Sequence, residues 1–370
     1  MKPEIVELRR ISLRLVTPFR ASYGIEHQRD VLLVRVVTPD GDGWGECAAL
    51  GEPLYSPEYV QGAHHVIATH LLPRLCARGD LVAADVGPVL AAVKGHPMAK
   101  AAIETAILDA ELRAAGVSLA RYLGATRDRV VAGVSVGITG SVGELVDAVG
   151  AYIEAGYRRV KLKIEPGWDV EPVRAVRERF ADVLLQVDAN GAYALEDAGH
   201  LGRLDAFDLL MLEQPLAEAE IRGHALLARL ITTPICLDES ITSAGAAADA
   251  IAAGACAIVN VKPGRVGGYL EARRIHDVCE ARGVPVWCGG MLETGIGRAG
   301  NIALAALPNF ILPGDLSASD RYYETDVTPP FVLDGGRLTV PTGPGLGVDV
   351  LRDVLDEVTT SVQEVSMAHG

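Results

Sequence analysis

The 370-residue sequence lacks the marks of several protein classes. No apolar run reaches the ~18 residues of a membrane span, and the opening MKPEIVELRRISLRL alternates apolar and charged residues instead of forming the apolar core of a signal peptide. Positive charge is in deficit, because the formal net charge is −14. Phosphate backbones select basic surfaces. We therefore expect a cytoplasmic protein that binds neither a membrane nor nucleic acid.

Cysteine is sparse and forms no CxxC pair. The six cysteines lie far apart, at Cys47, Cys76, Cys236, Cys256, Cys279 and Cys288. This pattern predicts buried, reduced thiols in an intracellular protein rather than a zinc site or a disulfide framework.

Length and hydrophobic content indicate more than one folded part. A chain of 370 residues is too long for one ordinary domain, and 49% apolar residues can bury a large core. Residues 1–125 begin with alternating, strand-like runs joined by turn residues, and the alanine-rich helical pattern KAAIETAILDAELRAA follows. We predict a small α+β domain there.

After residues 1–125 the pattern changes to short apolar runs that alternate with amphipathic helical segments. The eight candidate strands are VAGVSVGI, RRVKLKI, DVLLQVDAN, LLMLEQP, PICLDES, AIVNVKPG, VPVWCGG and NFILPGD. Eight such alternations predict a (β/α)₈ barrel over residues 126–325, with an open doubly wound sheet as the alternative. Strand and turn residues then return, and we expect residues 326–370 to fold back onto the first domain.

Charged residues interrupt strands that a parallel barrel covers on both sides and that are normally apolar. Lys163, Asp188, Glu213 and Asp238 are spaced by 25 residues, and Lys262 follows 24 later. One strand, loop and helix fills each interval, so we expect all five side chains at the same level of successive strands, at the catalytic end of the barrel. Each residue alone could be a helix cap, a turn residue or a surface residue. The repeated spacing favours one shared site.

This set of groups suits metal-assisted proton transfer. Three carboxylates without histidine or cysteine favour a hard cation, Mg²⁺ or Mn²⁺, over Zn²⁺. To act as a base near neutral pH, Lys163 must give up its proton, which burial, the neighbouring cation Lys161 and the metal all favour. We expect abstraction of a proton α to a carboxylate, with the metal stabilising the enediolate.

Five short motifs carry a resemblance to a known family. They are Lys161-x-Lys163, Asp188-Ala189-Asn190, Glu213-Gln214-Pro215, Asp238-Glu239-Ser240 and Lys262-Pro263-Gly264. In this order they resemble the muconate-lactonising subgroup of the enolase superfamily. Longer stretches, among them VPVWCGGMLETGIGRA, resemble its o-succinylbenzoate synthases that also racemise N-acylamino acids. The similarity extends over essentially the whole chain and implies a modified barrel with an α+β capping domain.

The resemblance implies a role for each central residue. Asp188, Glu213 and Asp238 would bind Mg²⁺. Lys163 would remove the α-proton and, in the synthase reaction of menaquinone biosynthesis, return it to the leaving hydroxyl in a syn dehydration. Lys262 would be an electrostatic partner in that reaction and the second acid or base in a racemisation.

The resemblance also implies supporting and substrate-binding residues. Lys161 would bind the substrate carboxylate, while Asn190 and Glu239 would support the site, with Asn190 also near the substrate. The remaining positions would close the mouth or line the pocket for the succinyl or acyl group: Phe19, Arg20, Tyr23 and Tyr55 from the first domain, and Ser135, Gly290, Met291 and Leu292 from the barrel. Phe19 and Met291 could equally be packing residues.

Several functions stay open on sequence alone, including the choice between dehydration and racemisation. A muconate cycloisomerase would use the same lysines and metal. A dipeptide epimerase of the subgroup would hold the substrate ammonium with Asp-x-Asp, whereas Gly314-Asp315-Leu316-Ser317 contains one acid. A non-enzymatic binding protein conflicts with the complete set of lysines and carboxylates. We expect a small-molecule carboxylate as substrate and a homo-oligomer.

Overall fold

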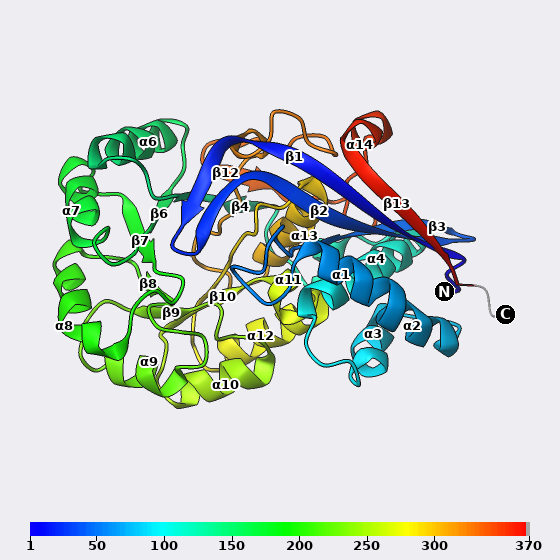
Figure 1. Cartoon of the computed structure of the whole chain (residues 1–370), viewed down its shortest axis with the longest axis horizontal. Helices are drawn as coiled ribbons and strands as arrows, with labels where there is room; N and C mark the ends of the chain where they lie inside the picture. The colour runs from blue at the N-terminus through cyan, green and yellow to red at the C-terminus, as the bar shows by residue number, and fades with distance from the viewer. Residues whose placement is uncertain (368–370) are drawn as a thin grey trace.

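The N-terminal sheet is built from the alternating runs of the sequence. β1 (Ile5–Ala21), β2 (Gly24–Thr38) and β3 (Gly41–Cys47) run antiparallel, and β13 (Thr359–Ser366) pairs with the other edge of β1. The turn residues between two of the alternating runs join β2 and β3 as a hairpin. The computed structural model, which describes residues 1–367, thus brings the two ends of the chain into one sheet (Figure 1).

A set of helices follows this sheet along the chain. They are α1 (Val60–Val66), the π-helical turn η1 (Ile67–Leu71), α2 (Leu72–Arg78), α3 (Ala83–Leu90), α4 (Pro97–Ala115) and α5 (Leu119–Leu123). α4 lies directly on β3 because β3 has glycine at the crossing: a Cβ on Gly45 would collide with the carbonyl oxygen of Ala102. This sheet and its helices form the capping domain. Within residues 1–367, no helix has both the length and the apolar character to cross a membrane.

The second part is a parallel barrel, as expected. Its strands, in spatial order, are β5 (Gly133–Val136), β6 (Arg159–Lys163), β7 (Leu184–Asp188), β8 (Leu212–Glu213), β9 (Ile235–Leu237), β10 (Ile258–Val261) and β11 (Val286–Cys288). The connections contain α6 (Val142–Glu154), α7 (Val170–Arg179), η2 (Leu195–Asp197), α8 (Ala198–Leu201), η3 (Gly202–Phe207), α9 (Ile221–Leu227), α10 (Ala244–Ala252), α11 (Pro263–Val266), α12 (Tyr269–Ala281) and α13 (Gly295–Ala305). Helices α6 to α10 line the outside of the curved sheet (Figure 1).

The expected eighth strand, NFILPGD, is not a regular strand. Its segment closes the gap between β11 and β5 through two isolated parallel bridges, one from Phe310 to Val286 and the other from Gly314 to Ala132. Pro313 lies within the segment and has no N–H to donate to a ladder. The barrel therefore closes with seven regular strands and one irregular segment.

The strand register corrects the expectation that all five charged residues lie at one level. Lys163 pairs with Asp188, and Asp188 pairs with Glu213, as expected. Glu213 then pairs with Cys236, so Asp238 lies two residues further along the chain. A closed barrel staggers its strands, and equal spacing in sequence therefore does not give equal height. Because side chains alternate along a strand, a shift of two residues keeps the same face.

The C-terminal segment contacts both domains. After η4 (Ser319–Arg321), β12 (Arg337–Thr339) pairs antiparallel with β4 (Arg129–Val131), which directly precedes β5. α14 (Arg352–Val358) then leads into β13 and its pairing with β1. The return to the first domain is made by β13, whereas β12 stays with the barrel.

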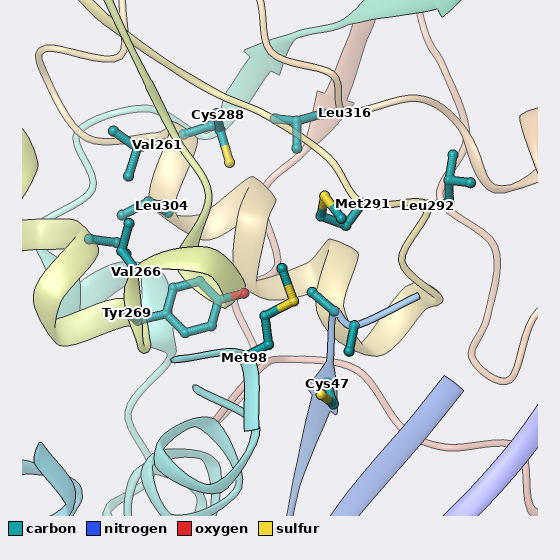
Figure 2. Close-up of a cluster of buried hydrophobic side chains, with 14 of the residues drawn as sticks. Cys47, Met98, Val261, Val266, Tyr269, Cys288, Met291, Leu292, Leu304 and Leu316 are labelled. Atoms are coloured by element: carbon teal, nitrogen blue, oxygen red, sulfur yellow. The ribbon is translucent and has the colours of Figure 1, made fainter. Parts of the chain in front are cut away.

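Buried apolar side chains join the two domains (Figure 2). Cys47 and Met98 of the capping domain meet barrel residues that include Tyr269, Met291 and Leu316. The capping domain thus packs beside the segment that follows β11.

Candidate active site

The two lysines of the Lys-x-Lys motif come from β6. Strand alternation separates them from Val160 and Leu162, which lie on the other face of the strand. Both lysines are buried, with side-chain exposures of 3% for Lys161 and 7% for Lys163. Ammonium groups this deep in a protein require anionic partners.

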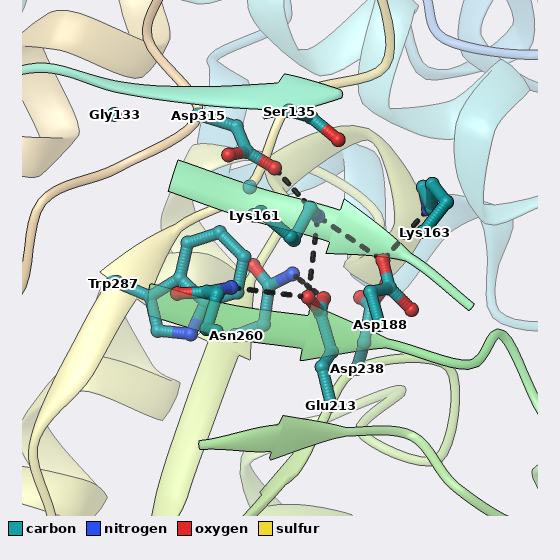
Figure 3. Close-up of polar contacts among 12 residues, drawn as sticks. Gly133, Ser135, Lys161, Lys163, Asp188, Glu213, Asp238, Asn260, Trp287 and Asp315 are labelled. Atoms are coloured by element: carbon teal, nitrogen blue, oxygen red, sulfur yellow. Dashed lines mark hydrogen bonds and ion pairs between the residues drawn. The ribbon is translucent and has the colours of Figure 1, made fainter. Parts of the chain in front are cut away.

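Carboxylates from the neighbouring strands supply these partners (Figure 3). Lys163 Nζ lies 2.7 Å from Asp188 Oδ2 and donates to Asn190 Oδ1 at 2.6 Å. Lys161 Nζ lies 3.1 Å from the same Asp188 oxygen and 3.2 Å from Glu213 Oε2. One carboxylate oxygen therefore contacts both ammonium groups.

A third lysine, which follows β10, meets the carboxylate beyond β9. Lys262 Nζ lies 2.7 Å from Asp238 Oδ2, and Arg265 Nη2 lies 3.0 Å from the other oxygen of that carboxylate. Tyr55 of the capping domain donates to Asp238 Oδ2 at 3.2 Å and accepts from Lys262 at 3.0 Å. Burial alone would lower the pKa of Lys262, but the Asp238 carboxylate raises that pKa well above the value of free lysine.

Burial and crowding shift the acidity of the carboxylates in opposite directions. Burial and the neighbouring Asp188 carboxylate raise the pKa of Glu213 to about 8. Burial also disfavours the ionised form of Asp188, but the ammonium groups of Lys163 and Lys161 outweigh it and hold the pKa of Asp188 below its usual range. Negative charge is therefore most crowded at Glu213.

The lysines border one small cavity of about 30 Å³. Its lining includes most of the residues expected from sequence: Phe19, Tyr23, Tyr55, Ser135, Lys161, Lys163, Lys262, Gly290, Met291 and Leu292. Ser135 Oγ is buried and has no hydrogen-bond partner within the described chain. Arg20 lies elsewhere, because its half-exposed guanidinium pairs with Glu165 at 3.0 Å and does not line the cavity.

The tip of the β1–β2 hairpin covers this end of the barrel, in the region that the resemblance expected to close the mouth. The two strands stay paired as far as Ala21 and Gly24. At the turn, Ser22 Oγ donates to the carbonyl oxygen of Ala189 in the barrel at 3.2 Å. The hairpin can be followed in Figure 1, where β1 and β2 extend from the capping sheet across the barrel.

Two family matches cover most of the chain. Residues 5–124 match the N-terminal domain of the mandelate racemase and muconate lactonizing enzymes, and residues 144–354 match the family described as enolase C-terminal domain-like. The chain belongs to the enolase superfamily. The resemblance seen in its short motifs is thereby confirmed.

The relatives of this enolase-superfamily chain are enzymes. It is 65% identical over 362 residues to an N-succinylamino acid racemase from an Amycolatopsis species, with 98% of each chain covered. It is 47% identical over 358 residues to an o-succinylbenzoate synthase from Geobacillus kaustophilus, with 96% of each chain covered. A crystal structure of a superfamily member from Listeria innocua matches it with a TM-score of 0.95 at 40% identity, over 100% of both chains.

The three carboxylates of this enolase-superfamily site have the donor chemistry for a divalent cation. All three are buried and offer only oxygen. Asp238 Oδ1 lies 3.0 Å from Arg265 but accepts no hydrogen bond of good geometry within the described chain, and burial together with the Asp188 carboxylate raises the pKa of Glu213. Within residues 1–367, only His276, Asp277 and Glu280 form a group of three His, Cys, Asp or Glu residues whose ligand atoms all lie within 4.8 Å of one another. The oxygens of the three carboxylates in the site are therefore farther apart than this limit. A shared ion therefore requires these side chains to rotate toward it.

Sequence reasoning missed the part that Asp315 has in the site. Its Oδ2 lies 2.6 Å from Lys161 Nζ, and its Oδ1 accepts from the buried Arg159 at 2.6 Å. Burial opposes ionisation, but these two cations hold the pKa of Asp315 below its usual range. The signal for Arg159 was present, since it shares the period-2 face of β6 with both lysines. Asp315 is thus an ionised carboxylate in the wall of the cavity, and the charges of Lys161 and Arg159 balance it.

Two amides also belong to the network. Asn260 Nδ2 donates to Glu213 Oε1 at 2.7 Å, and Gln186 Nε2 reaches Glu213 Oε2 at 3.4 Å. Both amides share a strand face with an expected site residue, and that alternation identifies them. Asn190 Nδ2 donates to Glu239 Oε1 at 2.8 Å, and burial raises the pKa of Glu239 to about 7.

Proposed function

We propose that the chain abstracts a proton α to a carboxylate, as an o-succinylbenzoate synthase, as a racemase of N-succinylamino or other N-acylamino acids, or as both. One observation carries this proposal: Lys163 and Lys262 border the same cavity and contact different members of the carboxylate cluster. Two amines at one cavity permit a proton to leave one face of a carbon and return on the other. The relatives include proteins named for each activity.

In the proposed racemisation, the substrate carboxylate binds at the ammonium of Lys161, which Asp315 anchors. Neutral Lys163 takes the α-proton at Nζ, and the electron pair left on carbon is delocalised into the carboxylate. The ammonium of Lys262 then gives a proton to the opposite face. The two lysines exchange roles for the other enantiomer.

In the proposed dehydration, Lys163 performs both proton transfers. It takes the α-proton and returns it to the leaving hydroxyl on the same face, so that the C–H and C–O bonds break and water departs. Lys262 stays charged throughout and stabilises the developing anion. Asp188, Glu213 and Asp238 would hold the divalent cation, Mg²⁺ or Mn²⁺, which would supply positive charge to stabilise the enediolate.

The site favours an uncharged or acylated nitrogen over a free ammonium. Asp315 is the acid that the cavity offers beyond the metal-ligand cluster, and both of its oxygens are already paired, with Lys161 and Arg159. A substrate ammonium would have to displace one of these cations at 2.6 Å. The arrangement therefore supports N-acyl substrates over dipeptides with a free amino end.

Two parallel assays with Mg²⁺ test the proposal. The first follows loss of the o-succinylbenzoate precursor, and the second follows entry of solvent deuterium at the α-carbon of each enantiomer of an N-succinylamino acid. We expect turnover in at least one assay. In Lys163→Ala, dehydration should be lost, and deuterium exchange should be lost for the enantiomer whose α-proton faces Lys163. The exposed Lys94→Ala is the matched control and should keep full activity. Dehydration, or exchange of both enantiomers, that survives in Lys163→Ala would refute the proposed base, and inactivity of the unaltered enzyme on both substrates would shift attention to muconate cycloisomerisation or dipeptide epimerisation.

A further inference from the structure

A fully buried arginine of the capping domain binds main-chain oxygens from separate segments. Arg29 lies in β2 and has no exposed surface. Its guanidinium donates to the carbonyl oxygens of Asp30 at 2.6 Å, Ala49 at 2.7 Å, Ala48 at 3.0 Å and Met291 at 3.3 Å. No carboxylate within residues 1–367 accepts a hydrogen bond from it.

The segments that Arg29 binds form the walls of the substrate cavity. Met291 lines the cavity and offers its own carbonyl oxygen, while Ala49 directly precedes Leu50, which also lines it. Arg29 itself belongs to the strand that continues into the hairpin tip, where Tyr23 lines the cavity. Three wall segments, distant in sequence, are therefore linked through one guanidinium.

The wall after β11 is held at other points as well. Tyr323 donates from its hydroxyl to the carbonyl oxygen of Leu292, which has a left-handed backbone with φ of 58°. Glu46 of β3 accepts from the N–H of Thr294 at 3.1 Å and from its hydroxyl at 2.7 Å. A non-glycine residue in that backbone region persists only when its surroundings hold it there. The capping domain thus determines the shape of a barrel loop.

Stability alone gives little reason for an arginine at this position. Burying a guanidinium without a paired carboxylate is costly, and an apolar side chain of similar volume is commonly neutral or stabilising by comparison. Only the planar fork of arginine presents five donors that can reach carbonyls in several directions. An arginine at position 29 is explained by its ability to hold several chain segments in fixed positions relative to one another.

We infer that Arg29 is a positioning residue for substrate specificity, fixing the hairpin, the Ala48–Leu50 segment and the Met291 wall relative to one another. The lysines and carboxylates of the barrel do not depend on it. Weakening the hydrogen bonds of Arg29 should therefore change which acyl groups and amino-acid side chains of the substrate fit the cavity, while the proton-transfer step continues. The inference rests on the proposed function only for its choice of assay substrates.

The test compares Arg29→Lys with the unaltered enzyme on a small and a bulky substrate, N-acetylalanine and N-succinylphenylalanine. We expect the ratio of kcat/KM between the two to change by about 10-fold or more, with most of the change in KM, because small misplacements of binding groups cost up to ~100-fold. Arg35→Lys is the matched control. It lies in the same strand, but its guanidinium pairs with Asp42 at 2.5 Å near the surface, and we expect no change in the ratio.

Hydrogen exchange provides a readout that needs no turnover. In Arg29→Lys, backbone amides of residues 290–294 and 48–50 should exchange faster, while those of β6 and β7 keep their protection. A folded Arg29→Lys with unchanged exchange and an unchanged kcat/KM ratio would overturn the inference. If that variant does not fold, Tyr323→Phe carries the test and should loosen residues 290–294 alone; unchanged exchange there would overturn the inference. Inactivity of the unaltered enzyme on both substrates would contradict the proposed racemase activity, and hydrogen exchange alone would then decide about Arg29.

Discussion

Replacing Lys262 with alanine should separate the two faces of the proton transfer. The variant retains Lys163, so α-proton exchange with solvent should persist for the one enantiomer whose proton faces that amine. Racemisation needs both amines and should fall by about 1,000-fold, since a positioned general acid or base contributes ~10²–10⁴-fold. Exchange of the favoured enantiomer should stay within about 10-fold of the unaltered rate, because Lys262 contributes only charge to that half-reaction.

The structure also sets the expected effect of this substitution on stability. Removing the ammonium takes away the contact of 2.7 Å to Asp238, but Arg265 at 3.0 Å and the hydroxyl of Tyr55 at 3.2 Å remain. The buried carboxylate is therefore not left without a counter-charge. We expect a loss of about 1–2 kcal/mol in the free energy of unfolding, below the ~3–5 kcal/mol that follows when a buried charge is left unpaired.

Proton NMR in deuterium oxide measures exchange for each enantiomer, and polarimetry measures racemisation. The reciprocal variant Lys163→Ala should retain exchange for the opposite enantiomer only. Loss of exchange from both enantiomers in equal measure in Lys262→Ala, with the fold intact by circular dichroism, would refute the assignment of one lysine to each face.

Three further results are expected. Addition of Mg²⁺ should raise the unfolding temperature, by an amount equivalent to about 2.7 kcal/mol at 100 times the dissociation constant; Asp188→Asn should lose this gain in differential scanning calorimetry. Gly45→Ala should destabilise the capping domain by about 1–3 kcal/mol or more because its Cβ collides with Ala102 O, whereas Gly87→Ala, with no atom within 4 Å of the new Cβ, should not, as urea unfolding would show. Burial raises the pKa of Glu104 to about 8, so the folded state holds a proton that the unfolded state releases above its ordinary pKa of 4.5. Stability from this group should be present in full below pH 4.5 and fall as pH rises toward 8, with a slope of at most about 1.4 kcal/mol per pH unit, and Glu104→Gln should flatten that slope in urea unfolding.

The central site could be predicted because its residues obey a regular pattern. Charged side chains at the ends of apolar strands stand out, and one βα unit separates each from the next. The height of each side chain along the barrel axis could not be predicted from this spacing. Glu213 pairs with Cys236 rather than with Asp238, because the stagger of a closed barrel depends on pairing between strands and leaves no trace in the spacing of residues.

The eighth barrel segment shows a different limit. NFILPGD has the composition of a strand, but Pro313 removes one ladder donor, and the segment forms only isolated bridges. Hydrophobic patterning detects that a segment is buried and extended, whereas regular pairing also requires a free N–H at each alternate position. The same segment ends in Asp315, whose partners Lys161 and Arg159 come from β6, near the edge of the sheet opposite β11. Contacts made by closing a barrel are visible only once the closure is known.

Arg29 shows why the walls of the cavity were harder to predict than its chemistry. In sequence it lies within the polar run EHQRD, before the apolar run of β2, and such a run is typical of a solvent-exposed strand end. The structure buries it because its guanidinium lies between Ala48 and Ala49 of the capping domain and Met291 of the barrel. Burial between domains is a property of their docking and not of the local pattern. Residues of this kind carry no periodic signal, and they are where relatives that share the same lysines and carboxylates can differ in the substrates they accept.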